Sequence, residues 1–568
     1  MDHQHDLVIV GGGLAGLRAA IEATARGMDC AVVSLVHPIR SHSGAAQGGV
    51  NASLRNQPDS QEDSIDLHAF DTVKGSDYLG DQDAIDLLVQ AAPTRVFEME
   101  NWGTPFSRNE NGTIAQRNLG GAQYARACYA ADKTGHYLLQ TMYERAVADG
   151  LRVYYDYFVE ELIVDDNTCR GIVAYNMRGG TIEAFGARAV LLATGGAGRA
   201  YGRSTSAIIN TGGGMVLAYR AGVPLRDMEF VQFHPTTLYG TNILMSEGCR
   251  GEGGYLVNSE GERFMANYAP SFMELAPRDV VARSIQTEID QGRGIDGQSY
   301  VHLDLRHLGE AKIAERLPGI RDLCIHFAAS DPVVDPIQVQ PGQHYSMGGI
   351  DVTPECQTSI AGLFAAGECA CVSVHGANRL GGNSLLETLV FGKIAGDTAC
   401  DYLASTKSAP ADDALRSSAE KALERRIAGL INHDAKETVG DLRAKVTAIM
   451  DDYVQVYRTE EGLTQAVAAL RDLRERCASV KVRSTSMLFN VDLVRTLELF
   501  SIVEVALAGA LGALARQESR GAHARKDFPK RDDANWMKHT LAHFKEEGPR
   551  LDYRPVTLGR FEPQERKY

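Results

Sequence analysis

Residues 6–20, DLVIVGGGLAGLRAA, decide the fold. The first five form a short run rich in β-branched residues that predicts a strand, and the alanine-rich end predicts a helix after a glycine-rich turn. In such a turn Gly11 permits the tight bend, Gly13 lets the backbone approach a pyrophosphate, and Gly16 lets the helix pack on the strand. The phosphates then lie at the positive end of the helix. The stretch predicts a Rossmann-type α/β domain that binds a dinucleotide.

The sequence further on favours FAD over NAD as that dinucleotide. The second predicted strand, residues 30–34, ends in Ser34, where an NAD-binding domain would carry an acid for the ribose. No second GxGxxG follows a strand, as a two-nucleotide reductase would require. The stretch 189–198, AVLLATGGAG, resembles the second signature of FAD-binding Rossmann proteins, where the chain returns to the cofactor.

Length and composition indicate a globular chain of several domains. At about 100 to 200 residues per domain, 568 residues make about three or four domains. The hydrophobic content of 44% and charged content of 23% are ordinary for a soluble protein. A formal net charge of −15 argues against nucleic acid as a partner. The ten cysteines form no CxxC, so we expect no metal or iron–sulfur site in this chain.

Neither an export signal nor a membrane span is expected. The N-terminal residues combine no basic region with an apolar stretch. The apolar run 505–515 is shorter than the roughly 20 residues that a span needs. We therefore expect a cytoplasmic chain whose attachment to a membrane comes through a partner.

Motifs distributed over the whole chain narrow the class further. In chain order they are RSHSGAAQGGV (40–50), DMEFVQFHPT (227–236), SEGCRGEGG (246–254), PRD (277–279), HYSMGG (344–349), HGANRLGGNSL (375–385), ESRGAH (518–523) and RDDANW (531–536). Together they resemble the flavoproteins of succinate dehydrogenase and fumarate reductase. The resemblance implies hydride transfer between succinate or fumarate and an FAD joined through its 8α-methyl to His42. That link should raise the flavin potential and so favour a reversible enzyme.

The resemblance also implies a cage for the two carboxylates of the substrate. Arginine offers a carboxylate a planar fork, and histidine and hydroxyl donors complete such a cage. The family assigns it to four residues: His234, Ser246, His344 and Arg379. An isolated histidine is more often structural, but these two lie within motifs.

Proton transfer is assigned by the resemblance to Arg278, with His234 also at the reacting centre. Because arginine is nearly always protonated, the role requires reprotonation through a relay, which the resemblance places at Glu247 and Arg250. A surface ion pair is the alternative for these last two residues.

The expected contacts to FAD lie in the glycine-rich turn, the attachment segment and the returning segments: Gly11, Gly13, Leu14, Ala15, Gly16, Ser34, His42, Ser43, Gly44, Gln47, Gly48, Gly49, Thr194, Gly195, Glu368, Arg379, Ser384 and Leu385. Two positions depart from the family. Leu119 replaces an aromatic residue before a glycine pair, which should alter packing over the dicarboxylate. Gly213 replaces an aspartate, which should remove one FAD contact.

The electrons must pass to another polypeptide, because the sequence shows no NAD site, haem motif or cluster motif. The resemblance implies an iron–sulfur subunit bound to a membrane anchor that handles quinone, at the cytoplasmic face of the cell membrane. Gln47, where some fumarate reductases carry Glu, tilts the expectation towards succinate oxidation. The physiological direction, the quinone type and the anchor composition stay open.

The predicted fold class is a Rossmann-type FAD-binding domain in two parts, 1–235 and 344–405, with an α+β capping domain inserted at 236–343. Helical spacing, as in 415–431, predicts a helical domain over 406–521 that forms a three-helix bundle. A short extension covers 522–568, and its charged run 525–533 is either a solvated face or a seat for the iron–sulfur partner. A proton donor on a capping domain implies that closure over the substrate completes the site.

Three other readings stay open. L-aspartate oxidase shares the fold and cap but lacks the attachment histidine, so His42 discriminates against it. A soluble periplasmic fumarate reductase would carry noncovalent FAD and a haem domain. A scaffold that lost catalysis is disfavoured by the complete set of clamp and relay residues.

Overall fold

A seven-stranded sheet forms the centre of the chain in this computed structural model, which describes residues 3–431 and 436–567. The strand order is β6-β2-β1-β9-β8-β7, and β16 also pairs with β9. The strands are β1 (His3–Val10), β2 (Cys30–Ser34), β6 (Arg152–Tyr155), β7 (Tyr157–Asp165), β8 (Thr168–Asn176), β9 (Thr181–Leu192) and β16 (Leu363–Ala365). The strands β6, β2, β1 and β16 run parallel to their neighbours, whereas β7, β8 and β9 form an antiparallel meander. The predicted α/β class is confirmed.

The glycine-rich turn joins β1 to helix α1 (Leu14–Ala25) by close backbone contact. Gly11 has a φ of +110°, and a Cβ there would lie 2.3 Å from the carbonyl oxygen of Ala193. A Cβ on Gly16 would lie 2.0 Å from the carbonyl oxygen of Gly11. These two glycines are therefore required for α1 to pack where β1 and β9 end.

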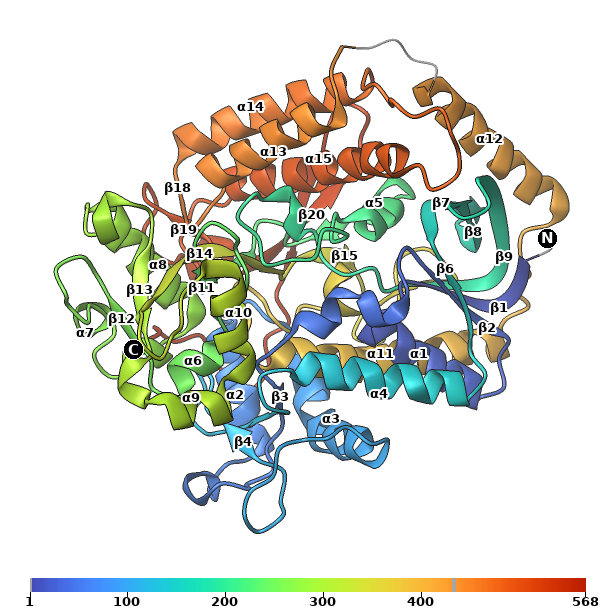
Figure 1. Cartoon of the computed structure of the whole chain (residues 1–568). Helices are drawn as coiled ribbons and strands as arrows, with labels where there is room; N and C mark the ends of the chain where they lie inside the picture. Colours follow the sequence, from blue (N-terminus) through green and yellow to red (C-terminus); the bar gives the residue numbers. More distant parts are fainter. Residues whose placement is uncertain (1–2, 432–435, 568) are drawn as a thin grey trace.

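Helices cover the face of this sheet on which α1 lies. Figure 1 shows α1, α4 (Thr134–Ala148) and α11 (Asn383–Ser405) packed together below the sheet, with α3 (Gln82–Asn101) and α2 (Ile65–Gly75) beyond them. Gly392 and Gly396 of α11 face α1 so closely that an added Cβ would lie 2.8 Å from a carbonyl oxygen of α1 in each case. The two helices flank the end of the sheet where β1, β9 and β16 finish.

A second, separate layer is built around a four-stranded antiparallel sheet of order β11-β14-β13-β12. Its strands are β11 (Val231–Leu238), β12 (Tyr255–Val257), β13 (Val301–Asp304) and β14 (Ile337–Ser346). Its helices are α6 (Glu247–Gly251), α7 (Met265–Tyr268), α8 (Arg278–Asp290), α9 (Glu310–Arg316) and α10 (Pro318–Ala328). The layer has its own apolar core, which includes Met245, Phe264 and Ile285. Strand β11 extends across residues 235–236 and strand β14 across residues 343–344, and the two strands pair with each other, with a shift of register between His234 and Thr237.

The segment 406–521 contains helices α12 (Asp413–Ile431), α13 (Val439–Tyr453), α14 (Glu460–Cys477) and α15 (Val491–Ala515). Helices α13, α14 and α15 pack against one another. Helix α12 lies apart, with Leu423 and Ile427 packed against Phe158 and Val173 of the central sheet. The periodic stretch 415–431 therefore covers a sheet face and takes no part in a bundle.

Helix α15 is long and apolar enough to cross a membrane, with a mean hydropathy of 1.8 over its best window. The apolar character extends beyond the run 505–515, because most residues before Glu504 in this helix are also apolar. The charged residues Glu498 and Glu504 are buried. The same window is 83% buried inside the protein. Burial to this extent is typical of a core helix.

The segment after residue 522 is integrated into the fold. Strand β20 (Lys538–His543) pairs with β10 (Leu225–Arg226) on one side and β21 (Arg550–Pro555) on the other, in a sheet completed by β15 (Gly349–Asp351) and β17 (Ala370–Cys371). In the charged run, Arg525 is 1% exposed and donates to Asp527 and to the carbonyl of Ala513. Arg531 donates to Asp77 at 2.8 Å. The interpretation of this run as a solvated face is therefore wrong for its arginines, which form internal ion pairs.

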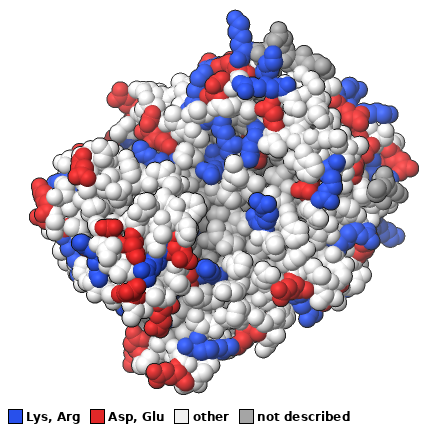
Figure 2. Space-filling view, viewed as in Figure 1, with Lys and Arg blue, Asp and Glu red and all other residues white. Residues whose placement is uncertain are grey.

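Surface charge is mixed on the face that Figure 2 shows, where acidic and basic side chains alternate. Although the net charge is −15, the acidic side chains do not form one continuous patch on this face. Nothing on this face resembles the clustered basic surface of a nucleic-acid-binding protein.

Gly16→Ala should destabilise the protein. The new Cβ meets a backbone oxygen that cannot move alone, so overpacking should cost about 1–3 kcal/mol and lower the Tm. Gly429→Ala is the matched control, because Gly429 is also within a helix and its added Cβ meets nothing within 4 Å. That control should leave the Tm unchanged or raise stability by about 0.5–1 kcal/mol. Equal thermal unfolding curves for the two variants would contradict the close-packing argument.

Candidate active site

One cavity of about 530 Å³ runs between the glycine-rich turn and the antiparallel layer. It brings together nearly all the predicted site residues: Gly11, Gly13, Leu14, Ala15, Ser34, His42, Ser43, Gly44, Gln47, Gly48, Gly49, Thr194, Gly195, His234, Ser246, Glu247, Arg278, His344, Glu368, Arg379, Ser384 and Leu385. Gly16 and Arg250 do not line it. Gly16 packs α1 on the turn, and Arg250 lies behind Glu247.

The end of the cavity at β1 and α1 fits a dinucleotide. Helix α1 begins after Gly13, which has no side chain to cap it. The Leu14 N–H donates to Ser43 Oγ at 3.3 Å, and the N–H groups that follow it in the first turn are available to an anion. Nearby, the buried polar atoms Ser41 Oγ, Gln47 Oε1 and Asn210 Nδ2 have no hydrogen-bond partner within the part of the chain that the structure describes. Gly213 borders the cavity with open space around its Cα. These donors and acceptors suit a large polar cofactor such as FAD.

His42 lies in a short 3-10 turn between the two ends of the cavity. The backbone N–H of Ala207 donates to its Nδ1 at 3.2 Å, so this nitrogen acts as an acceptor. Burial, assisted by the charge of Arg199, lowers the pKa of His42 to about 4. The imidazole is therefore neutral at neutral pH.

Two neutral histidines face each other at the far end of the cavity. His234 on β11 and His344 on β14 have ring centroids 5.0 Å apart. Burial lowers both pKa values well below the ordinary range, and the Arg278 charge adds to the effect. The N–H of Thr236 donates to His234 Nδ1 at 3.2 Å, while Nε2 of His234 has no partner among the described residues. His234 can therefore donate a hydrogen bond into the cavity.

Arg379 lies beside these histidines and is buried. Its guanidinium stacks 4.5 Å from the ring centroid of Tyr345 and donates to Ser384 Oγ at 3.1 Å. Burial, together with repulsion from Arg278, lowers the pKa of Arg379 to about 9, so it remains protonated at neutral pH. Ser246 completes this end of the cavity and caps α6 by accepting from the Gly248 N–H at 3.1 Å.

Arg278, Glu247 and Arg250 form a buried chain. Arg278 donates through Nε and Nη2 to Glu247 Oε2, at 2.9 and 2.6 Å. Nη2 of Arg250 lies 3.6 Å from Glu247 Oε1, which also accepts from the Gly120 N–H at 2.7 Å. Burial acts to raise the pKa of Glu247, but the Arg278 and Arg250 charges outweigh it and hold the pKa below its usual value. All three side chains are buried, so the surface ion pair does not describe them.

Sequence reasoning missed two polar residues that organise this end. Gln232 accepts from Arg278 Nη1 at 3.0 Å and donates to the carbonyl of Arg379 at 2.7 Å, so it links the two arginines. Thr205 lies 2.8 Å from His344 Nδ1. Gln232 lies two residues before His234, and side chains two residues apart on a strand point to the same face. This alternation could have identified Gln232 from the sequence. No local pattern pointed to Thr205.

Leu119 is buried behind the cavity and does not line it. A Cβ added to Gly48 would lie 3.8 Å from Leu119 Cδ1, and one added to Gly381 would lie 3.2 Å from Leu119 Cβ, so both glycines approach this side chain closely. Among the described residues no cluster of three or more His, Cys, Asp or Glu side chains is placed to hold a metal ion.

Comparison with known proteins gives consistent matches along the whole chain. The FAD binding domain family matches residues 6–385, and the fumarate reductase flavoprotein C-term family matches residues 443–568. The succinate dehydrogenase flavoprotein subunit of Rickettsia felis is 44% identical, with 98% of this chain and 96% of that protein covered. The fumarate reductase flavoprotein subunit of Mycobacterium tuberculosis is also 44% identical, with both chains covered completely.

A solved structure shows the same similarity in three dimensions. The flavoprotein of E. coli quinol fumarate reductase superposes with a TM-score of 0.95 at 42% identity, covering 100% of this chain and 99% of that one. Matches of this identity and coverage show more than a shared fold. The chain belongs to the family of succinate dehydrogenase and fumarate reductase flavoprotein subunits.

Proposed function

We propose that the chain is the catalytic flavoprotein subunit of a succinate:quinone oxidoreductase, which interconverts succinate and fumarate. One observation carries this proposal: two arginines and two neutral histidines converge at one end of a cavity whose other end suits a dinucleotide. A small dianion needs this type of cage, because each carboxylate must exchange its hydration for charge-assisted hydrogen bonds.

The carboxylates would be held by His234, Ser246, His344 and Arg379. Arg379 offers its fork to one carboxylate, and the neutral histidines donate N–H groups without adding charge. The surrounding positive charge also favours negative charge that develops on the substrate during reaction, a stabilisation that preorganised sites provide. FAD, when bound, supplies the hydride acceptor or donor.

The proton would be delivered or removed by Arg278. In fumarate reduction one alkene carbon receives hydride, and an Arg278 N–H gives its proton to the neighbouring carbon. Glu247 hydrogen-bonds two Arg278 nitrogens and lies beside Arg250, so it is placed to return a proton to Arg278. Burial of the trio excludes water as a competing donor at this position.

The cofactor would be attached covalently through His42, and the electrons would leave through an iron–sulfur subunit to quinone at a membrane anchor. A neutral imidazole is the form that can bond to the 8α-methyl, and the low pKa of His42 keeps it neutral. Since Nδ1 is engaged by the Ala207 N–H, the bond is expected at Nε2. The complex would hold this chain peripherally at the cytoplasmic face of the cell membrane.

His42→Ser should abolish covalent flavin. The wild-type band should fluoresce in a denaturing gel near 61.6 kDa, and the variant band should not. The variant should retain some fumarate reduction while losing most succinate oxidation, because a flavin without the link has a lower potential. Equal loss of both activities would contradict the potential argument. A noncovalent wild-type flavin would instead favour an L-aspartate oxidase type of enzyme.

The purified chain alone should reduce an artificial acceptor such as phenazine methosulfate with succinate but should not reduce quinone. The intact membrane complex should do both. Assays of the two preparations with the same succinate concentration make this comparison. Quinone reduction by the chain alone would rule out the need for an electron-carrying partner.

Arg278→Gln and Arg379→Gln should leave different kinetic signatures. The first should lower kcat by orders of magnitude with little change in malonate affinity, because it removes a group needed only for reaction. The second should weaken malonate binding by about 1.5–3 kcal/mol, because a carboxylate loses a charged donor. Titration of the flavin absorbance with malonate measures affinity without turnover. If malonate binding were lost in Arg278→Gln and intact in Arg379→Gln, the two roles would be reversed.

A further inference from the structure

Residues 557–567, here called the tail, are anchored on helices α2 and α3. Phe561 exchanges two hydrogen bonds with Gln82, at 2.8 and 3.0 Å, and its ring packs against Phe70 with centroids 5.5 Å apart. Arg560 pairs with Asp66 at 2.7 Å and with Asp86 at 3.0 Å. The tail is thus fixed to the part of the chain that carries the FAD-binding turn.

At its end the tail reaches the capping layer through Arg566. One nitrogen, Nη2, lies 2.7 Å from Asp279 Oδ2 and 3.1 Å from Asp77 Oδ2. The side chains of Arg566, Asp279 and Asp77 are 8%, 0% and 7% exposed. Asp279 belongs to the first turn of α8 and directly follows Arg278. A single guanidinium therefore joins α8 to the segment after α2.

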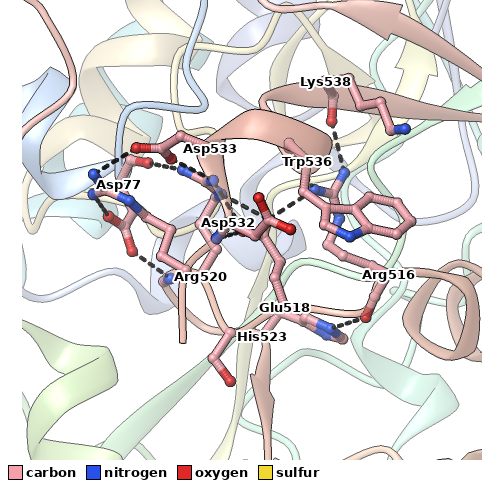
Figure 3. Close-up of polar contacts among 12 residues, drawn as sticks. Asp77, Arg516, Glu518, Arg520, His523, Asp532, Asp533, Trp536 and Lys538 are labelled. Carbon is pink, nitrogen blue, oxygen red and sulfur yellow. Dashed lines mark hydrogen bonds and ion pairs between the residues drawn. The ribbon is translucent and has the colours of Figure 1, made fainter. Parts of the chain in front are cut away.

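The Asp77 end of this bridge is held firmly. Its carboxylate accepts from the Gly521 N–H and from Arg531, both at 2.8 Å, and its carbonyl accepts from Arg520 at 3.0 Å. Figure 3 shows how Arg520 continues from Asp77 to Glu518 and Asp533, and how Glu518 meets Arg516. Because these partners are themselves paired, the position of Asp77 is well defined. An ion pair to Asp77 can therefore fix the position of α8.

The Asp279 end carries a buried negative charge. Burial acts to raise its pKa, but Arg566 and Arg283 outweigh this effect and lower the pKa to about 2. Arg283 donates to Asp279 at 3.0 Å and also to the carbonyl of Gly521 at 2.7 Å. A buried carboxylate that loses one of two cations is poorly compensated, and the helix turn that carries it must move towards another donor or water.

We propose that Arg566 is a positioning residue for proton transfer. By tying Asp279 to Asp77, it holds the first turn of α8 so that Arg278 meets Glu247 and Gln232. This role rests on the proposed function of Arg278. His234, His344 and Arg379 lie on β11, β14 and the segment before α11, so helix α8, which the bridge holds, carries none of them. Removing Arg566 should therefore impair the reaction more than substrate binding.

The test compares Arg566→Gln with Arg560→Gln in the intact complex. Both residues lie in the tail and each contacts two aspartates, but Arg560 touches only α2 and α3. Arg566→Gln should lower kcat for succinate oxidation on the order of 10- to 100-fold, the loss that a misplacement of about 1 Å produces. Malonate affinity and covalent flavin should stay near wild type, whereas the Tm should fall, because the buried carboxylates of Asp279 and Asp77 each lose a cation. Arg560→Gln should keep wild-type kcat, and Arg566→Lys should recover much of it.

A double-mutant comparison with Asp279→Asn isolates the bridge. Arg566→Gln and Asp279→Asn should be non-additive in kcat, since both break the ion pair between Arg566 and Asp279, whereas Arg560→Gln and Asp279→Asn should be additive. Unchanged kcat in Arg566→Gln, or a loss of kcat accompanied by equally weakened malonate binding, would overturn the positioning role. The wild-type complex is the control for the proposed function. If it is active with succinate and fumarate, a negative result in the variants counts against the positioning role alone. If it is inactive with both, the proposed function fails as well.

Discussion

Two guanidinium groups buried at one end of a cavity impose the constraint that organises the rest of the site. Arg278 and Arg379 repel each other, and Arg278 contributes to lowering the pKa of Arg379. The structure offsets this cost with Glu247 beside Arg278 and with Tyr345 and Ser384 beside Arg379. What remains is a pocket with an excess of positive charge, which a dicarboxylate can neutralise. A site of this type selects its ligand by charge more than by shape.

The same charge explains why the histidines are neutral. A protonated His234 or His344 would add a further cation among buried arginines, so the fold keeps both pKa values low. Neutral imidazoles still donate one hydrogen bond each, which is sufficient for a carboxylate. Their positions follow from one ladder, because β11 and β14 are paired and carry one histidine each. In the proposed mechanism Arg278 transfers the proton, and its supporting residues come from the capping layer and from the tail.

Segments far apart in the sequence meet around this site, and they do so mainly through ion pairs. The strand β20 lies beside β10, about three hundred residues earlier in the chain, and His539 there bridges Asp227 at 2.6 Å and Asp81 at 3.0 Å. Arg566 makes the corresponding connection to α8. These buried ion pairs therefore connect the FAD-binding part, the capping layer and the C-terminal segment.

The sequence by itself determined the features that depend on local backbone geometry and on motif chemistry. The turn at Gly11 to Gly16 and the dinucleotide-binding fold were predictable, because a glycine pattern between a strand and a helix has few other uses. The family was predictable because its motifs follow in order along the whole chain. Tertiary structure decided the rest. It placed α12 on the sheet, turned Arg525 and Arg531 inward, and brought Gln232, Thr205 and Arg566 to their partners. Residue spacing cannot show such contacts, because a buried charge finds its partner through the packing of elements that lie hundreds of residues apart.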